Sequence, residues 1–298
     1  MINKTFDLQE YFSEKRKQIE AALDRFLPQE DQYPQILFRA MRYSVLDGGK
    51  RIRPVLVLAA CEAVGGDSEK ALPTACAVEF IHSFSLIHDD LPALDNDDFR
   101  RGKPTNHKVF GEAMAMLAGD ALLALAFETI TKTEGVPANT ILDVTRRIAA
   151  AAGTGGMVVG QVVDMESEGR KIELETLEFM HSHKTGALIE ACIVCGGLLG
   201  GATSEQLAAL SLYGRKIGLA FQIVDDILDL EGEQEKLGKT VGSDLRKQKS
   251  TFPAILGLEK SKEKALQVTQ EALKALESFD MRAEPLRAIA RFIVERKT

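Results

Sequence analysis

Residues 204–230 read SEQLAALSLYGRKIGLAFQIVDDILDL, and this stretch decides the fold. Apolar side chains occur on most faces of the helix that it predicts, which is typical of a helix inside a large bundle. The end of the stretch nevertheless carries Asp225, Asp226 and Asp229. Asp225 and Asp229 are four residues apart, so their carboxylates lie on one helix face and repel each other. We therefore expect a cation to compensate this acidic group.

The same helical periodicity runs through most of the chain. Apolar residues recur every three or four positions, and no segment shows the alternation that is typical of a strand. Glycine and proline interrupt this pattern without forming a flexible linker. The predicted helices cover residues 6–27, 34–47, 54–64, 71–91, 111–132, 138–152, 173–200, 204–230, 251–279 and 283–296. The sequence therefore predicts an all-α fold, a large helical bundle in which residues 1–298 form a single domain.

The composition is that of a globular protein. Of 298 residues, 45% are hydrophobic and 27% are charged, which excludes disordered and fibrous classes. The net charge of −7 argues against a nucleic-acid partner. The longest apolar run, residues 191–202, is shorter than the roughly 20 residues of a membrane-spanning helix. We therefore expect a cytoplasmic protein without membrane insertion, and we interpret Cys192 and Cys195, within this run, as core residues.

Another acidic cluster, DDLPALDNDD, occupies residues 89–98 at the end of another apolar helix. It is the first acidic cluster along the chain, and residues 225–229 form the second. Asp89 and Asp95 are six residues apart and would point in different directions on a straight helix. Pro92 ends or kinks the helix and can fold Asp95 back toward Asp89. Clustered carboxylates without suitably spaced Cys or His suit Mg²⁺, which also binds phosphate oxygens. The two clusters therefore predict a magnesium–phosphate site between helices.

Basic segments accompany the acidic clusters. GGKRIRP occupies residues 48–54, RRGKP residues 100–104 and GKT residues 238–240. Arginine forks and lysine ammonium groups are common partners of phosphate oxygens. A nucleotide-binding P-loop fits the third segment poorly, because Glu233 stands where its first glycine should be. His181 and His183 lie two residues apart, on different helix faces, and we interpret them as surface residues.

In their order along the chain, five motifs resemble those of the trans-isoprenyl diphosphate synthases, and they are similar above all to bacterial farnesyl-forming members. The motifs are GGKRIRP, DDLPALDNDDFRRGKPT, HKTGALI, FQIVDDILD and GKTVGSDLRKQKSTFP, between about residues 45 and 255. The resemblance implies a helical bundle around a central deep cavity, usually a homodimer. It also implies a prenyltransferase that condenses dimethylallyl or geranyl diphosphate with isopentenyl diphosphate. The expected products are farnesyl diphosphate and diphosphate, formed by Mg²⁺-assisted ionisation of the allylic substrate.

The resemblance also implies roles for individual residues. Three Mg²⁺ ions, for which Mn²⁺ could substitute, are expected on Asp89, Asp90, Asp95, Asp225, Asp226 and Asp229. The residues implied to bind the allylic diphosphate are Arg100, Lys184 and Lys239. Those implied to bind the diphosphate of isopentenyl diphosphate are Lys50, Arg53, His82 and Arg101. Near the reacting carbon, the resemblance implies Thr185 and Gln222.

Product length depends on residues one helical turn before the first acidic cluster. Phe84 and Ser85 precede Asp89 by five and four positions. An aromatic ring there would form the floor of the hydrocarbon pocket, and in the family it goes with the fifteen-carbon product. A geranyl or geranylgeranyl diphosphate synthase and a terpene cyclase remain alternatives, as does a non-catalytic helical partner subunit. We interpret residues 296–298 as a frayed tail rather than a lid over bound diphosphate.

Overall fold

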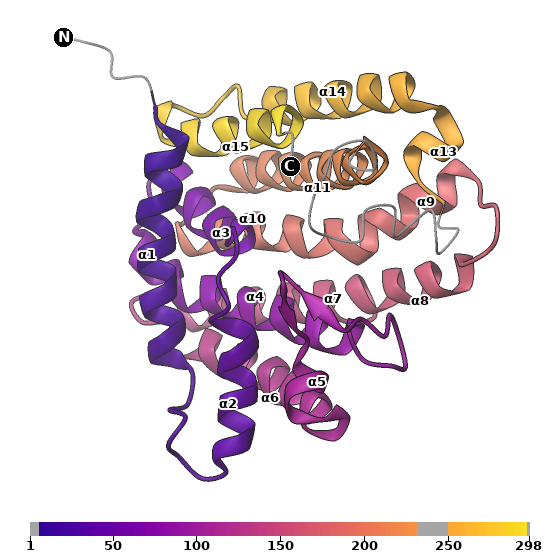
Figure 1. Cartoon of the computed structure of the whole chain (residues 1–298). Helices are drawn as coiled ribbons and strands as arrows, with labels where there is room; N and C mark the ends of the chain where they lie inside the picture. Colours follow the sequence, from indigo (N-terminus) through magenta and orange to yellow (C-terminus); the bar gives the residue numbers. More distant parts are fainter. Residues whose placement is uncertain (1–5, 232–249, 297–298) are drawn as a thin grey trace.

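The computed structural model describes residues 6–231 and 250–296, which form an almost entirely helical bundle (Figure 1). Its helices are α1 (Leu8–Phe26), α2 (Gln35–Val45), α3 (Ile52–Ala63), α4 (Ser68–Asp89), α5 (Asn106–Phe110), α6 (Glu112–Thr131), α7 (Ala138–Ala152), α8 (Met157–Ser167), α9 (Leu174–His181), α10 (Ala187–Leu199), α11 (Ser204–Glu231), α13 (Phe252–Leu256), α14 (Leu258–Ala275) and α15 (Glu284–Glu295). A π-helical segment, η1 (Ser182–Gly186), joins α9 to α10, and a 3₁₀ turn, η2 (Met281–Ala283), precedes α15. The all-α prediction is confirmed.

The helices are stacked in layers. Figure 1 shows α14 and α15 at one end of the molecule, followed by α11, by α10 with α9, and by the layer that contains α4. α4 packs on α3 and α6, whereas α10 packs on α3 and α11. The two helices that end in acidic clusters, α4 and α11, therefore lie on opposite sides of the α3–α10 layer.

The central layer holds the core. Every side chain of α3 from Pro54 to Cys61 is buried, and each fully buried Val or Leu contributes about 1.5–3 kcal/mol. α10 approaches α3 closely because residue 196 is glycine: a Cβ there would lie 2.1 Å from the carbonyl oxygen of Val57. Burial raises the pKa of the Cys192 thiol to about 12. The interpretation of Cys192 and Cys195 as buried core residues is confirmed.

The helix boundaries differ from the prediction in a few places. The helix predicted over 251–279 is interrupted at Gly257, whose φ of +85° ends α13. α8 was not predicted, because the glycines within residues 153–156 indicate a break, and no helix was expected between residues 152 and 173. The expectation that the chain has no strand is also wrong in one place. A hairpin of two-residue strands, β1 (Phe99–Arg100) and β2 (Lys103–Pro104), follows the first acidic cluster.

Three helical stretches of the described chain are long and apolar enough to cross a membrane by length and composition: Glu112–Thr131, Ala138–Ser167 and Ser204–Glu231. The expectation that no helix meets this criterion is therefore wrong. It rested on uninterrupted apolar runs, whereas these stretches include isolated charged residues. In the bundle, less than half of each stretch is buried, and the second comprises two helices, α7 and α8.

Candidate functional site

The first acidic cluster folds back on itself after α4. The backbone N–H of Asp95 donates to the carbonyl oxygen of Asp89 at 2.8 Å, as expected from Pro92. The pKa of Asp89 is raised, first by burial and also by the charge of Asp95, while Lys184 and Arg100 oppose the rise. Two carboxylates and two cations thus act on one another at the end of α4.

Asp90 is held by an arginine of the hairpin. Nε of Arg100 lies 2.9 Å from both carboxylate oxygens of Asp90, and Nη2 lies 2.6 Å from Oδ1. The carboxylate is almost fully buried, and burial raises its pKa against the opposing effect of Arg100. Both oxygens of Asp90 are therefore already bonded to the protein, in the bidentate geometry that arginine favours.

The basic residues expected to bind a second diphosphate surround His82. The pKa of His82 lies well below its usual range, because the protein displaces water from the ring and because Arg53, Arg101 and Arg100 lie nearby. Lys50 is exposed in the turn that precedes α3. The structure thus gathers arginines around a neutral imidazole, an arrangement that attracts an anion.

The hairpin rests directly on the glycine turn of residues 48–49. Nη1 of Arg101 donates to the carbonyl oxygen of Gly48 at 2.8 Å, and Lys103 pairs with Asp47. Gly49 has a φ of +119°, and a Cβ there would lie 3.0 Å from the Arg101 guanidinium. The two basic segments are therefore held together before any ligand binds.

A buried ion pair below this turn was missed in the sequence. Nη1 of Arg51 lies 2.6 Å from Oε1 of Glu79, and the two side chains are 1% and 4% exposed. Nη2 of Arg51 donates to the carbonyl oxygen of Val45 at 2.7 Å. The position of Glu79, an acid inside the apolar helix 71–91, was the signal that could have identified it. The pair anchors the turn that carries Lys50 and Arg53.

Asp226 of the second acidic cluster is also bonded to the protein. Oδ2 of Asp226 accepts the backbone N–H of Phe252 at 2.9 Å, and it lies 3.3 Å from Nε2 of His181. Asp226 and His181 are each 6% exposed. The interpretation of His181 as a surface residue is therefore wrong, because α11 and α13 cover its ring. His183 does lie near the surface, stacked on Phe179.

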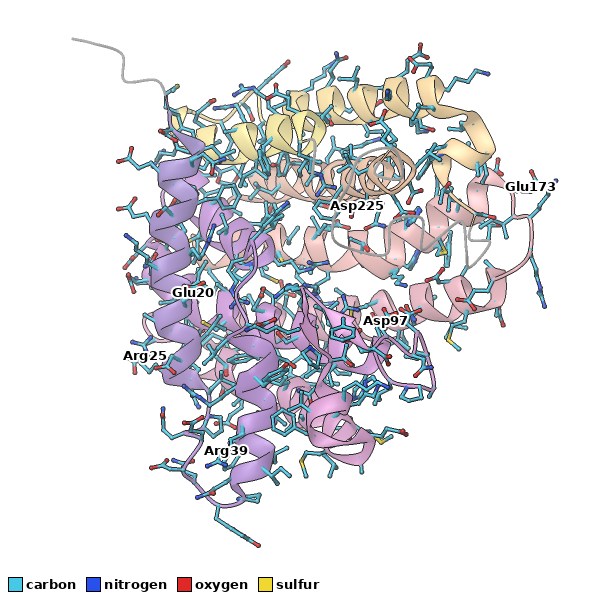
Figure 2. The ribbon with its side chains drawn as sticks, in the orientation of Figure 1. Glu20, Arg25, Arg39, Asp97, Glu173 and Asp225 are labelled. Carbon is cyan, nitrogen blue, oxygen red and sulfur yellow. The ribbon has the colours of Figure 1, made fainter. Side chains whose placement is uncertain are left out.

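Asp225 is paired with the end of the chain. The guanidinium of Arg296 binds Asp225, donates to the carbonyl oxygen of Phe221 and lies 4.2 Å from the centre of the Phe221 ring. Burial raises the pKa of Asp225, and Arg296 opposes the rise. The interpretation of residues 296–298 as a frayed tail is therefore wrong for Arg296, whose side chain is 6% exposed. Figure 2 shows Asp225 on α11 and Asp97 of the first cluster on separate layers.

The π-helical segment carries two expected site residues. Nζ of Lys184 lies 2.6 Å from Oδ2 of Asp164 on α8, and Thr185 is buried. A Cβ on Gly160 would lie 2.1 Å from the backbone nitrogen of Lys184, so only glycine permits this approach of α8 to the segment. Lys239 lies outside the described residues.

Within residues 6–231 and 250–296, no three His, Cys, Asp or Glu side chains gather closely enough to hold a metal ion. The first cluster nevertheless has the donor chemistry that Mg²⁺ requires, since Asp89 and Asp95 raise the density of carboxylate charge in one place. Asp225 differs from Asp226 in that its side chain is 41% exposed. Asp90 and Asp226 are buried, whereas Asp89, Asp95 and Asp225 are partly exposed, so the latter three fit a magnesium-binding role better, although Asp225 pairs with Arg296.

The two residues expected to limit product length lie on neighbouring faces of α4. Ser85 is one turn before Asp89, on the same face, and its hydroxyl donates to the carbonyl oxygen of His82 at 2.9 Å. Phe84 is half-buried, and its ring meets the ring of His88 edge-on at 4.9 Å. Nε2 of His88 in turn lies 3.0 Å from the carbonyl oxygen of Met116 on α6. Phe84 therefore packs beside His88, whose ring contacts α6.

Comparisons with known proteins agree with this architecture. The model of the family described as "Polyprenyl synthetase" matches residues 34–287. A dimethylallyltranstransferase of Fischerella ambigua is 53% identical over 99% of this chain and 86% of its own length. A geranylgeranyl diphosphate synthase of Cyanophora paradoxa is 50% identical over 99% of this chain and 98% of its own length.

Solved structures extend the similarity to the fold. The crystal structure of an FPP/GFPP synthase from Zymomonas mobilis superposes with a TM-score of 0.87 and 39% identity, and the match covers 96% of this chain and 98% of that one. The names of the Zymomonas mobilis and Cyanophora paradoxa proteins state different products, and that of the Fischerella ambigua protein states none, so the comparisons do not confirm the expectation of a farnesyl product.

Proposed function

The chain belongs to the polyprenyl synthetase family of prenyltransferases, and from this premise we propose that it joins an allylic diphosphate to isopentenyl diphosphate. One observation carries the proposal. Asp89, at the end of α4, is close enough to both Lys184 and Arg100 for their charges to act on its carboxylate. Carboxylates for a metal ion and cations for phosphate oxygens therefore converge from three separate chain segments.

We assign the metal-binding role to Asp89, Asp95, Asp225 and Asp229, and Asp90 and Asp226 act as anchors within the protein. When bound, Mg²⁺ would supply Lewis-acid stabilisation of the negative charge on the leaving diphosphate. Of the chain's own groups, Arg100 would orient the allylic diphosphate through its fixed guanidinium. Lys184, held by Asp164, and Lys239, outside the described residues, would bind the same diphosphate.

The second substrate would bind at the arginine-rich cluster. Lys50, Arg53, His82 and Arg101 would take the diphosphate of isopentenyl diphosphate, because Arg53, Arg101 and Arg100 lie close enough to His82 to lower its pKa. Thr185 and Gln222 would then lie near the reacting carbon. No side chain is assigned as the final base, since the released diphosphate can accept the proton.

The proposed main product is farnesyl diphosphate, limited by Phe84 as the chain-length floor together with Ser85. The support is the half-buried ring of Phe84, about one turn before Asp89, which packs against His88 at the side of α4 that contacts α6 through His88. Geranylgeranyl diphosphate is the second candidate product, and the name of the Cyanophora paradoxa relative favours it.

We also propose a cytoplasmic homodimer formed through α6. Met116 and Leu117 of this helix are 51% and 53% exposed, and Ala113 and Ala124 are exposed on the same side, with the exposed Asp120 between them. Large exposed apolar patches commonly mark interaction sites. A second copy of the chain would cover these apolar side chains, and α6 would then present no exposed apolar surface to a membrane.

The test uses the purified chain with Mg²⁺, isopentenyl diphosphate and either dimethylallyl or geranyl diphosphate. We expect diphosphate release that requires both substrates and stops when a chelator removes the metal. Asp89→Asn should abolish the reaction, whereas Asp98→Asn, the same change on an exposed aspartate of the same cluster, should retain it. Release with one substrate alone, or none with both, would contradict the proposal; the latter would favour a non-catalytic partner subunit.

A further inference from the structure

The buried ring of His181 lies between two side chains of α11. Its Nδ1 is 3.1 Å from Nε2 of Gln222, and its Nε2 is 3.3 Å from Oδ2 of Asp226. The ring also stacks on that of Phe252, with 5.6 Å between the centroids and 15° between the planes. α9, α11 and α13 therefore meet at this ring, immediately before η1 (Ser182–Gly186).

Two groups that can only donate fix the direction of the hydrogen bonds around this ring. The backbone N–H of Phe252 can only donate, and it donates to Oδ2 of Asp226 at 2.9 Å. The amide nitrogen of Gln222 can also only donate, and it lies 3.1 Å from Nδ1 of His181. Nδ1 is therefore the acceptor of this bond, whereas Nε2, 3.3 Å from Oδ2 of Asp226, has no hydrogen-bond partner among the described residues. The amide oxygen of Gln222 consequently points away from the ring.

We propose that His181 is a positioning residue that fixes the orientation of the Gln222 amide. The inference rests on the proposed function, in which Gln222 lies near the reacting carbon. The terminal torsion of a glutamine side chain is broad, so without an acceptor at Nδ1 the amide would rotate. A fixed dipole stabilises charge that develops in the transition state, whereas a rotating one must be reoriented first. Loss of His181 should therefore lower kcat and leave the KM of both substrates nearly unchanged.

Two substitutions that introduce an amide, His181→Asn and His181→Gln, distinguish the role of Nδ1 from that of Nε2. His181→Asn places an acceptor near the position of Nδ1, which can still receive the Gln222 amide. His181→Gln reaches instead toward the position of Nε2 and Asp226. We expect kcat to fall about tenfold or more in His181→Ala and His181→Gln, and His181→Asn to recover most of that loss. His183→Asn, the same change on the neighbouring stacked histidine, should keep kcat within about twofold of the wild type.

A double variant tests whether His181 acts through Gln222. When Gln222→Ala is already present, the further change His181→Ala should not lower kcat again, because the amide that it orients is gone. If the two losses multiply, or if His181→Asn is as slow as His181→Gln, the inference is wrong. A rise in KM at constant kcat would also overturn it.

Urea unfolding of the same four proteins (wild type, the two single variants and the double variant) gives a readout that needs no activity. The two substitutions should be non-additive in the midpoint of unfolding, as for residues in direct contact. A wild-type chain without prenyl transfer but with this coupling would reject the proposed function and keep the His181–Gln222 contact. Additive unfolding effects in an active enzyme would reject the contact alone. His181→Asn and His181→Gln decide the question if His181→Ala does not fold.

Discussion

Arg100 binds both carboxylate oxygens of Asp90, and this pair ties the hairpin to the end of α4. Asp90→Asn keeps the size of the side chain but leaves a partly buried guanidinium without its charged partner. We expect the free energy of unfolding to fall by about 1–3 kcal/mol. We also expect kcat/KM for the allylic substrate to fall about a hundredfold, since Arg100 is no longer held in place.

Urea unfolding and initial rates measure both effects. Asp98→Asn is the matched control, because the pair of Asp98 with Lys108 is exposed and should contribute less than about 1 kcal/mol. Arg100→Lys should behave like Asp90→Asn, because an ammonium cannot make the bidentate contact. Full activity of either variant would show that the hairpin does not depend on this pair.

Asp89→Asn should stabilise the metal-free protein while it removes activity. Burial and Asp95 raise the pKa of Asp89 in the folded state, so the ionised group destabilises the fold at neutral pH. Each kcal/mol gained should raise the melting temperature by about 2 °C in a chain of this size. The difference from the wild type should vanish below the unfolded pKa of 3.8, where the carboxyl is protonated in both states.

Asp143 provides a control, because its substitution should shift the melting temperature in the opposite direction. Its pKa is lowered, first by Arg146, so its carboxylate stabilises the folded state at neutral pH and less so as the pH falls through the lowered value. Asp143→Asn should therefore lower the melting temperature slightly at pH 7, with a smaller effect in acid. If both variants shift the curve in the same direction at pH 7, the assigned electrostatics are wrong.

Phe84→Ala should lengthen the product. Without the ring, the hydrocarbon tail can pass beyond the turn that precedes Asp89, and chromatography of the products should show twenty carbons or more. Phe179→Ala, which removes an exposed ring on α9, should leave the product unchanged. An unaltered profile in Phe84→Ala would remove this residue from the control of chain length.

Met116→Glu combined with Leu117→Glu should convert a dimer to a monomer, because two charges on each copy would be buried against the partner. Sedimentation velocity reports the change in mass directly. Met281→Glu, on the exposed turn η2, should leave the mass unchanged. A wild-type protein that sediments as a monomer at micromolar concentration would contradict the proposed interface.

Arg296→Ala should destabilise the metal-free protein by about 1 kcal/mol, because Asp225 is half-exposed and solvent weakens the pair. With Mg²⁺ and inorganic diphosphate present, the difference in melting temperature should shrink, since another cation can then neutralise Asp225. Arg291→Ala, which breaks an exposed pair with Glu284, should show no such dependence on metal. Equal differences with and without Mg²⁺ would show that Arg296 does not compete for Asp225.

The sequence predicted the helices well, because buried faces repeat every three or four residues, and it predicted the return of Asp95 from the chemistry of Pro92. It did not predict α8. The glycines within residues 153–156 predicted a break, but the chain after them forms a helix that contains Gly160, where the backbone of Lys184 leaves no room for a Cβ. A close approach between segments 24 residues apart leaves no periodic signal in either segment.

The sequence could not predict which aspartates are bonded to the protein, for a similar reason. Within each cluster the aspartates look alike in sequence, but Asp226 is bonded to Phe252, and the partners of His181 come from a helix that begins 23 residues later. Only the folded chain shows which carboxylate faces solvent and which faces the protein. The roles implied by family resemblance stay predictions until substrates are bound.

The contact between Gly160 and Lys184 affects how tightly a ligand can bind. A lysine side chain on an open surface samples many rotamers, and a ligand that captures it must restrict that freedom. Here the backbone of Lys184 is immobilised by α8 and its ammonium by Asp164 during folding itself. Because of this preorganisation, Lys184 can exchange the carboxylate of Asp164 for an incoming anion with little loss of conformational entropy.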